Sequence, residues 1–169
     1  AAANGMPWAV ALEKGFFKEA GVDVTGVISS LGGGPDLRVL LGGNLPYAEA
    51  GLSAVAAANQ AGADLVIVSD NVHTVSDILW VTRKDSPIES IKDLKGKTIG
   101  VNAIGGTNYA SARMVLQNGG IDPDREAKLI PIGDQKLIYE ALKIGRVDAV
   151  MATPPYSVIL QKEGYPLLG

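Results

Sequence analysis

Apolar residues follow two spacings that alternate from one end of the chain to the other. In some stretches they recur every third or fourth residue, as in an amphipathic helix; in others they alternate or run together, as in a strand. The first spacing predicts helices at residues 7–14, 35–41, 54–61, 108–117, 135–144 and 156–162, with short helical turns at 16–20 and 90–94. The second predicts strands at residues 22–28, 47–50, 65–68, 78–82, 98–101, 128–131 and 148–151.

The order of these elements indicates an α/β fold. Strands that alternate with helices pair mainly in parallel through right-handed crossovers, and ligands of such sheets bind beyond the carboxyl ends of the strands. Residues 65–68 are uninterruptedly apolar, which is typical of a parallel strand buried on both faces. The polar segment R-K-D-S-P interrupts the apolar pattern. We therefore expect a first lobe at residues 1–82, a connector at 83–87 and a second lobe at 88–169.

The stretch from residue 98 to residue 113 carries the clearest sign of a ligand loop. Its strand leads into a glycine-containing loop, and Thr107 can accept from the first free amides of a helix that begins at Asn108. These amides and the positive end of the helix dipole would face an acceptor or anionic group above Gly105 and Gly106. The segment G-V-N-A-I-G-G-T resembles a phosphate-binding loop, but Gly106 replaces the lysine, which weighs against a nucleotide. The alternative is that the two glycines only turn the chain.

Few side chains suggest catalysis or metal binding. His73 is the only histidine, and nothing in the sequence positions a nucleophile beside it. No cluster of His, Asp or Glu has the spacing of metal ligands, so we expect neither a metal nor a cofactor. Glu49 ends a predicted strand, and we expect it either to face a ligand or to occupy an exposed edge. Trp8, Tyr109 and Tyr156 lie near helix starts, where rings close over small organic ligands; core packing is the alternative for Trp8.

Composition excludes several classes of function. The chain is 47% apolar and 20% charged, which is typical of a globular protein, and no segment is apolar for the length that a membrane span needs. A net charge of -3 argues against general nucleic-acid binding. The chain contains no cysteine, so it has no disulfides and no thiolate chemistry.

Three blocks in order resemble the periplasmic substrate-binding proteins of ABC importers, in the nitrate/sulfonate/taurine and thiamine-precursor group. They are P-W-A-V-A-L-E-K-G-F-F-K-E-A-G-V-D-V, I-K-D-L-K-G-K-T-I-G-V and A-L-K-I-G-R-V-D-A-V-M-A-T-P-P-Y. The resemblance implies a type II periplasmic-binding-protein fold, with two α/β lobes, each a mainly parallel sheet flanked by helices, that close over one small molecule. It further implies a periplasmic or extracytoplasmic location, docking on an ABC permease, and binding without catalysis.

The resemblance and the predicted strand ends together give a set of candidate ligand-binding residues in both lobes. They are Met6, Trp8, Leu31, Gly32, Gly33, Gly34, Glu49, Gly51, Leu52, Asn71, Gly105, Gly106, Thr107, Asn108, Tyr109, Thr153, Pro154 and Tyr156. No arginine falls in these loops, which favours a neutral or cationic organic ligand over a sulfonate.

The chain also departs from this group in two respects. Members begin with a strand before the A-N-G-M-P loop and continue well beyond the P-P-Y helix. We therefore expect a fragment or a shortened chain, with a sheet edge in the first lobe either exposed or covered by self-association with another copy. Two other functions stay open. An enzyme on the same fold would need Glu49 and His73 to meet, and the missing cysteines weigh against pyrimidine-precursor synthesis; a sensory ligand-binding domain is the other.

Overall fold

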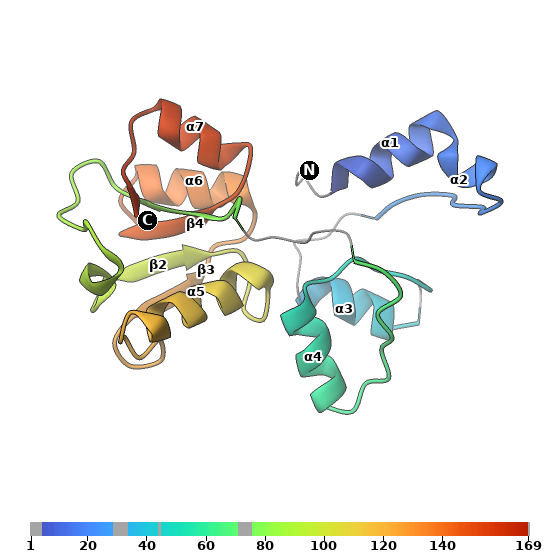
Figure 1. Ribbon diagram of the computed structural model, residues 1–169, viewed down its shortest axis with the longest axis horizontal. Coiled ribbons are helices and arrows are strands. Elements are labelled where there is room, and N and C mark those ends of the chain that lie inside the picture. Colours follow the sequence, from blue (N-terminus) through green and yellow to red (C-terminus); the bar gives the residue numbers. More distant parts are fainter. Residues whose placement is uncertain (1–4, 29–33, 44, 71–75, 169) are drawn as a thin grey trace.

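The computed structural model describes residues 5–28, 34–43, 45–70 and 76–168, which form an N-terminal part (residues 5–70) and a sheet part (residues 76–168) (Figure 1). The N-terminal part holds α1 (Met6–Lys14), α2 (Phe16–Glu19), α3 (Gly34–Leu41) and α4 (Leu52–Gln60). The helices of the sheet part are the 3-10 helix η2 (Ile91–Leu94), α5 (Thr107–Asn118), α6 (Gln135–Lys143) and α7 (Tyr156–Lys162). The α/β fold class is thus confirmed.

The sheet part is organised around a five-stranded sheet in the order β3-β2-β4-β1-β5. Its strands are β1 (Leu79–Thr82), β2 (Thr98–Val101), β3 (Lys128–Pro131), β4 (Ala149–Ala152) and β5 (Leu167–Leu168). β2 pairs in parallel with β3 and β4, whereas β1 runs antiparallel to both β4 and β5. The sheet is therefore mixed, because β1 enters it from the opposite direction.

Helices cover both faces of this sheet and bury a separate apolar cluster on each. On one face α5 packs Ala112 and Leu116 against Ile99 of β2. On the other face α6 packs Ile138 and Leu142 against the strands, together with Leu160 of α7. Figure 1 shows α5 on one side of the sheet and α6 with α7 on the other. Alternate strand residues thus supply two cores, as the period of a strand requires.

Gly100 is the strand position where a side chain would not fit. A β carbon there would lie 3.2 Å from Val150 Cγ1 and 3.3 Å from Ile132 Cγ1. Real β carbons seldom approach their neighbours this closely in packed interiors. The glycine therefore lets the α6 face of the sheet close over β2 without displacing Val150.

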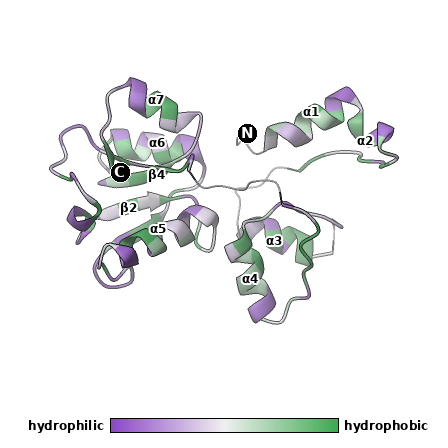
Figure 2. Ribbon diagram, viewed as in Figure 1, coloured by the Kyte–Doolittle hydropathy of each residue, from purple (hydrophilic) through white to green (hydrophobic). Residues whose placement is uncertain are grey.

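The N-terminal part confirms the predicted helices but not the predicted strands. Residues 22–28, 47–50 and 65–68 belong to no strand of the described chain. The run 65–68, which we expected to be buried on both faces, is exposed at Val66, Ile67 and Val68. Figure 2 shows apolar residues along the segments that follow α2 and α4. The strand prediction is wrong here because a strand needs partners on its edges, and the described residues supply none to these segments.

The strand β1 also differs from expectation in its sheet. The sequence places residues 78–82 in the first lobe, but Leu79 to Thr82 pair with Ala152 to Ala149 of β4. The chain therefore joins the sheet part before residue 83, and residues 83–87 follow β1 instead of preceding the sheet. The division into two lobes that close over a ligand stays a prediction. In the part of the chain that the structure describes, no helix has the length and apolarity to cross a bilayer.

Candidate functional site

The loops that follow β2, β3 and β4 meet at one edge of the sheet, because these three strands run in the same direction. Asn102, directly after β2, is the centre of their hydrogen bonding. Its Oδ1 accepts from Asn108 Nδ2 at 2.8 Å and from Gln135 Nε2 at 2.9 Å. Its Nδ2 donates to the carbonyl oxygen of Gly133 at 2.9 Å. One amide side chain therefore joins α5, α6 and the loop after β3.

Two further hydrogen bonds bring β4 into the same network. Gln135 Oε1 accepts from the Thr153 amide at 3.0 Å, and Asn108 Nδ2 lies 3.3 Å from the Met151 carbonyl oxygen. Asn108 is buried, so its amide group needs these partners. Asn108 and Thr153 were expected in the site from the sequence, whereas Asn102 and Gln135 were not. Their signal was available: each is an amide residue placed directly after a strand or at a helix start.

The helix α5 begins one residue earlier than predicted. Gly106 is its N-cap residue, with an extended backbone, and no side chain caps it. Thr107 is the first helical residue, so the prediction that its side chain caps the helix is wrong. Gly105 precedes the cap with a φ of 81°, a left-handed conformation that favours glycine. The first intrahelical bond runs from the Ala110 amide to the Gly106 carbonyl at 3.0 Å, which leaves earlier amides of the turn without helical partners.

A second helix start lies against the first. α4 begins after its N-cap residue Gly51, again without a side-chain cap. A β carbon at Gly51 would overlap the Thr107 hydroxyl, and Ser53 Oγ donates to the Gly105 carbonyl oxygen at 3.5 Å. Figure 1 shows the start of α4 beside the loop that leads into α5. The structure thus brings together Gly51, Gly105, Gly106 and Thr107, which were expected in the site from separate parts of the sequence.

Trp8 and Glu49 form a second pair from the candidate set. The Trp8 indole nitrogen donates to the Glu49 carboxylate, which joins α1 to the segment that precedes α4. The same indole stacks on Phe17, with ring centroids 6.3 Å apart and an interplanar angle of 8°. Trp8 is therefore held on both its polar and its apolar side, although 38% of it stays exposed.

The remaining candidates are dispersed. Met6 and Leu52 are exposed at the starts of α1 and α4, and Gly34 begins α3. Tyr109 packs against the core on the α5 face, and Tyr156 contacts Tyr139 with centroids 5.5 Å apart. Pro154 is joined to Pro155 by a cis peptide bond. Contact of these residues with a ligand stays a prediction.

Some expectations cannot be placed. Leu31, Gly32, Gly33, Asn71 and His73 lie outside the described residues. The meeting of Glu49 with His73, on which an enzymatic function depends, is therefore untested. Within the described ranges, no group of His, Asp and Glu has the geometry to hold a metal ion.

Comparison with known proteins identifies the family. The profile of the NMT1/THI5-like family matches residues 2–167. The chain is a member of the NMT1/THI5-like family. It is 30% identical over 159 residues to the Bacillus subtilis protein named "Putative binding protein YtlA". The matched region covers 94% of this chain and 47% of that protein.

Solved structures resemble the NMT1/THI5-like chain in fold. The aliphatic sulphonate binding protein SsuA of Escherichia coli superposes with a TM-score of 0.74 at 22% identity, over 94% of this chain and 54% of SsuA. SsuA from Xanthomonas axonopodis pv. citri, bound to MOPS, superposes with a TM-score of 0.82 at 22% identity, over 99% of this chain and 57% of that protein. This family member therefore spans about half the length of the relatives that it matches.

Proposed function

We propose that this protein captures a small molecule between two lobes, outside the cytoplasm, and delivers it to an ABC permease. The observation that carries the proposal is the contact between the starts of α4 and α5, at Gly51 and Thr107, neither of which is capped by a side chain. Both helix dipoles direct positive charge toward the same space. An acceptor or anionic group on a ligand would bind amides from both helices and relieve the repulsion between them.

The descriptions of the relatives support the solute-binding part of this proposal. The Bacillus subtilis relative is named as a binding protein, and the Escherichia coli structure is described as a periplasmic sulphonate binding protein. Binding between two lobes needs donors that are already positioned, and the Asn102 network holds the loops of the sheet part in place. We propose that the N-terminal part supplies the opposite wall, through Gly51, Ser53 and the Trp8–Glu49 pair.

Two observations bear on the chemical class of the ligand, and each can be tested. The facing helix starts favour a ligand with an acceptor group, and the SsuA neighbour with MOPS makes sulfonates the first probes. The absence of arginine from the predicted loops, together with Glu49, favours a neutral or cationic molecule. We propose a small organic molecule with an acceptor at the α5 start and a neutral or cationic portion beside Glu49.

A thermal-shift screen tests the function and the ligand class together. Alkanesulfonates including MOPS, nitrate, pyrimidines and amines would each be added at increasing concentration. A ligand at about one hundred times its Kd stabilises the folded protein by roughly 2.7 kcal/mol, which is a readily measured rise in Tm. Stabilisation by sulfonates alone would overturn the neutral or cationic class, and no stabilisation by any of these solutes would contradict solute capture.

A double variant tests the position of the site. Thr107→Ala with Gly106→Val should abolish the ligand-induced rise in Tm, since it alters the first turn of α5. A β carbon at Gly106 would lie 3.3 Å from the Ala103 carbonyl oxygen, so the loop must shift slightly to admit the valine. Thr25→Ala with Gly26→Val is the matched control, since Gly26 has no neighbour within 4 Å of an added β carbon. Unchanged binding in the first variant would refute the role of the α5 start.

A further inference from the structure

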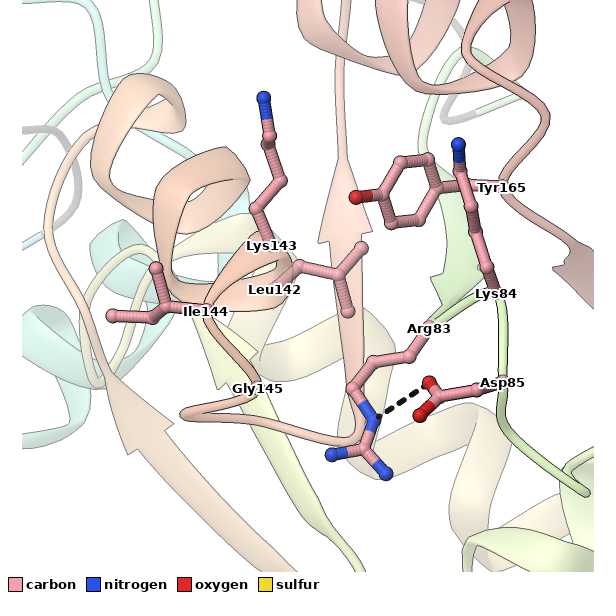
Figure 3. Close-up of a pocket in the computed structure, with 8 residues that line it drawn as sticks. All are labelled: Arg83, Lys84, Asp85, Leu142, Lys143, Ile144, Gly145 and Tyr165. Atoms are coloured by element: carbon pink, nitrogen blue, oxygen red, sulfur yellow. Dashed lines mark ion pairs between the residues drawn. The ribbon is translucent and has the colours of Figure 1, made fainter.

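A pocket lies at the opposite end of the sheet from the loops described above (Figure 3). It has a volume of about 370 Å³, within the usual range for small-molecule pockets. Its position follows from the register: Thr82, which precedes it, pairs with Ala149 at the beginning of β4, whereas Thr153 follows the end of β4. The residues that line it are Arg83, Lys84, Asp85, Leu142, Lys143, Ile144, Gly145 and Tyr165.

The charge of this pocket is opposite to that of the whole chain. Arg83, Lys84 and Lys143 line it with a single carboxylate, Asp85, whereas the chain carries a net charge of -3. Lys84 Nζ lies 4.9 Å from the centre of the Tyr165 ring, and among the described residues it forms no ion pair. Lys143 Nζ donates to the Tyr139 hydroxyl at 2.9 Å. That hydrogen bond raises the pKa of Lys143, so its amine is charged at neutral pH.

Arg83 brings a guanidinium group to the floor of the pocket. Its Nε is buried and has no hydrogen-bond partner among the described residues, since Asp85 Oδ1 lies 3.6 Å away. Its Nη1 occupies the space beside Gly145, 3.2 Å from where a β carbon would lie. Gly145, with a φ of 71°, ends α6 and leaves this room. Arg83 thus forms an ion pair with Asp85, but its Nε–H has no hydrogen-bond acceptor, so a ligand that supplies one is favoured.

The end of α6 does not oppose an anion as strongly as a bare helix C-terminus would. The backbone amides of Ile144 and Gly145 donate to the carbonyl oxygens of Glu140 and Leu142, respectively, each at 3.1 Å. The backbone amide of Arg146 donates to the carbonyl oxygen of Ala141 at 2.9 Å. These terminal carbonyl oxygens are therefore already paired.

Tyr165 adds a neutral donor and an apolar wall. Burial raises the pKa of Tyr165, so the phenol keeps its proton at neutral pH. Figure 3 shows its ring across the pocket from Leu142, with the hydroxyl directed toward that side chain. The pocket thus combines cationic donors with the apolar face of the Tyr165 ring, whereas Leu142 beneath it belongs to the buried core. A ligand that matches both must carry an anionic group and a short apolar group.

We propose that this pocket binds a small organic carboxylate, with its anionic group facing the Arg83 guanidinium and its apolar group against the Tyr165 ring, in the field of Lys84 and Lys143. The site is separate from the starts of α4 and α5, so it does not depend on the function proposed above.

Nitrogen–proton correlation NMR of the intact chain tests the proposal, with benzoate as the probe and benzamide as its neutral analogue. Benzoate should shift the Arg83 Nε–H and Gly145 amide signals saturably, whereas benzamide should not. Raising the salt from about 50 mM to about 300 mM should weaken the binding roughly threefold or more. Equal shifts by both probes, shifts confined to residues 105–107, or the absence of any saturable shift would overturn the proposal.

A pair of double variants adds a second test. Lys84→Ala with Lys143→Ala should weaken benzoate binding by about fivefold or more, because two nearby positive charges are removed. Lys92→Ala with Lys136→Ala makes the same change in net charge away from the pocket and should leave binding unchanged. Equal affinity in both double variants would overturn the proposal. If the first variant does not fold, the comparison of benzoate with benzamide decides the question in the unaltered chain.

Discussion

The N-terminal part and the sheet part share a pattern of apolar segments between helices, yet only one of them forms a sheet. Val150 and Ile99 in the sheet part are completely buried. Val66 and Val68, in a similarly apolar run of the N-terminal part, are 78% and 76% exposed. The difference teaches that apolar sequence is necessary for a buried strand but does not by itself create one.

The difference arises because the hydrogen bonds of a helix are local in the sequence and those of a strand are not. A helix satisfies its backbone hydrogen bonds within one segment, whereas a strand satisfies them only on neighbouring strands. β4 has β1 on one edge and β2 on the other, so its amides and its side chains are both covered. The apolar segments of the N-terminal part have no such neighbours in the described chain.

The first prediction places the same charge in each of the two regions. Val150→Asp should destabilise the sheet part by about 4 kcal/mol or more, because it buries an unpaired carboxylate. Val66→Asp should change stability by no more than about 0.5 kcal/mol, because that side chain is exposed. Urea unfolding would be followed by the fluorescence of Trp80, which is buried in the sheet part, in a Trp8→Phe background.

An equal loss in the two variants would break the comparison. It would mean that Val66 is covered in solution, for example by a second copy of the chain. Measuring both variants over a range of protein concentrations separates these cases, since only self-association makes the loss depend on concentration.

The fold could be predicted from the sequence wherever local signals decide it. The strand 128–131 and the helix 156–162 have the predicted bounds, and α1 ends before Gly15 as expected. What the sequence did not show was the antiparallel entry of β1, because apolar spacing carries no information on strand direction. The strands of the N-terminal part failed for the related reason that pairing is a property of the assembled chain.

The candidate site could be predicted in part, wherever a local signal in the sequence marks one of its residues. Glycines before a helix mark a helix start, and Gly51 and Gly106 both occupy N-cap positions. That these two helix starts touch could not be inferred, since 55 residues of sequence spacing do not fix a distance in space; the contact comes from the fold. Asn102 and Gln135 were missed because their role depends on the hydrogen bond between them, which forms only when the fold brings the two side chains together.

The second prediction uses two asparagines that each tie loops together, one in each region. Asn102→Ala should destabilise the sheet part by about 2 to 3 kcal/mol, since it removes the partner of Asn108 and Gln135. Asn59 makes a similar pair of bonds with the Leu65 backbone, at 2.9 and 3.0 Å, but is exposed. Asn59→Ala should therefore cost only about 0.5 to 1 kcal/mol. Urea denaturation measures both changes, and the reverse order would contradict the central role of Asn102.

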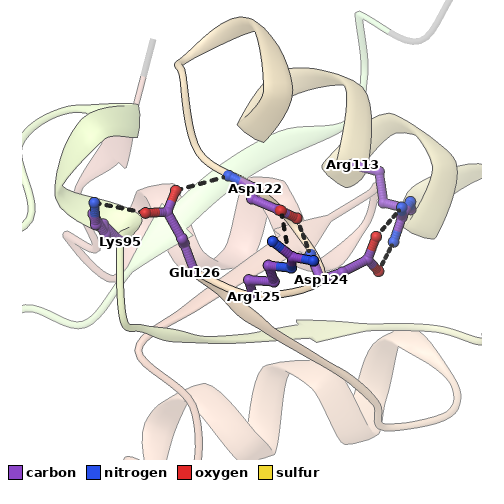
Figure 4. A network of polar contacts seen from close by, with 6 residues as sticks. All are labelled: Lys95, Arg113, Asp122, Asp124, Arg125 and Glu126. Atoms are coloured by element: carbon purple, nitrogen blue, oxygen red, sulfur yellow. Dashed lines mark hydrogen bonds and ion pairs between the residues drawn. The ribbon is translucent and has the colours of Figure 1, made fainter.

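The smallest expected effect is a change in how the Tm depends on acid pH. It originates in polar contacts at the surface of the sheet part, most of which form one network (Figure 4). Lys95 Nζ lies 2.7 Å from Glu126 Oε1, and Arg113 Nη2 donates to Asp124 Oδ2 at 2.7 Å. The hydrogen bond from Arg113 lowers the pKa of Asp124, and that from Lys95 lowers the pKa of Glu126. Near η2, the hydroxyl of Ser90 lowers the pKa of Asp93 in the same way.

The third prediction follows from the sign of these shifts. A carboxyl group whose pKa is lower in the folded state binds fewer protons there, so its stabilising contribution is present above its unfolded pKa and lost as the pH falls through the folded pKa. The window therefore opens near the ordinary values of 4.5 for Glu126 and 3.8 for Asp93 and Asp124, and extends below them. Asp93→Asn, Asp124→Asn and Glu126→Gln together should lower the Tm of the sheet part at pH 7 but not at the acid end of this window. The effect should be modest, because exposed ion pairs contribute little. A triple variant whose Tm falls with acid as steeply as that of the unaltered chain would assign the acid sensitivity to other groups.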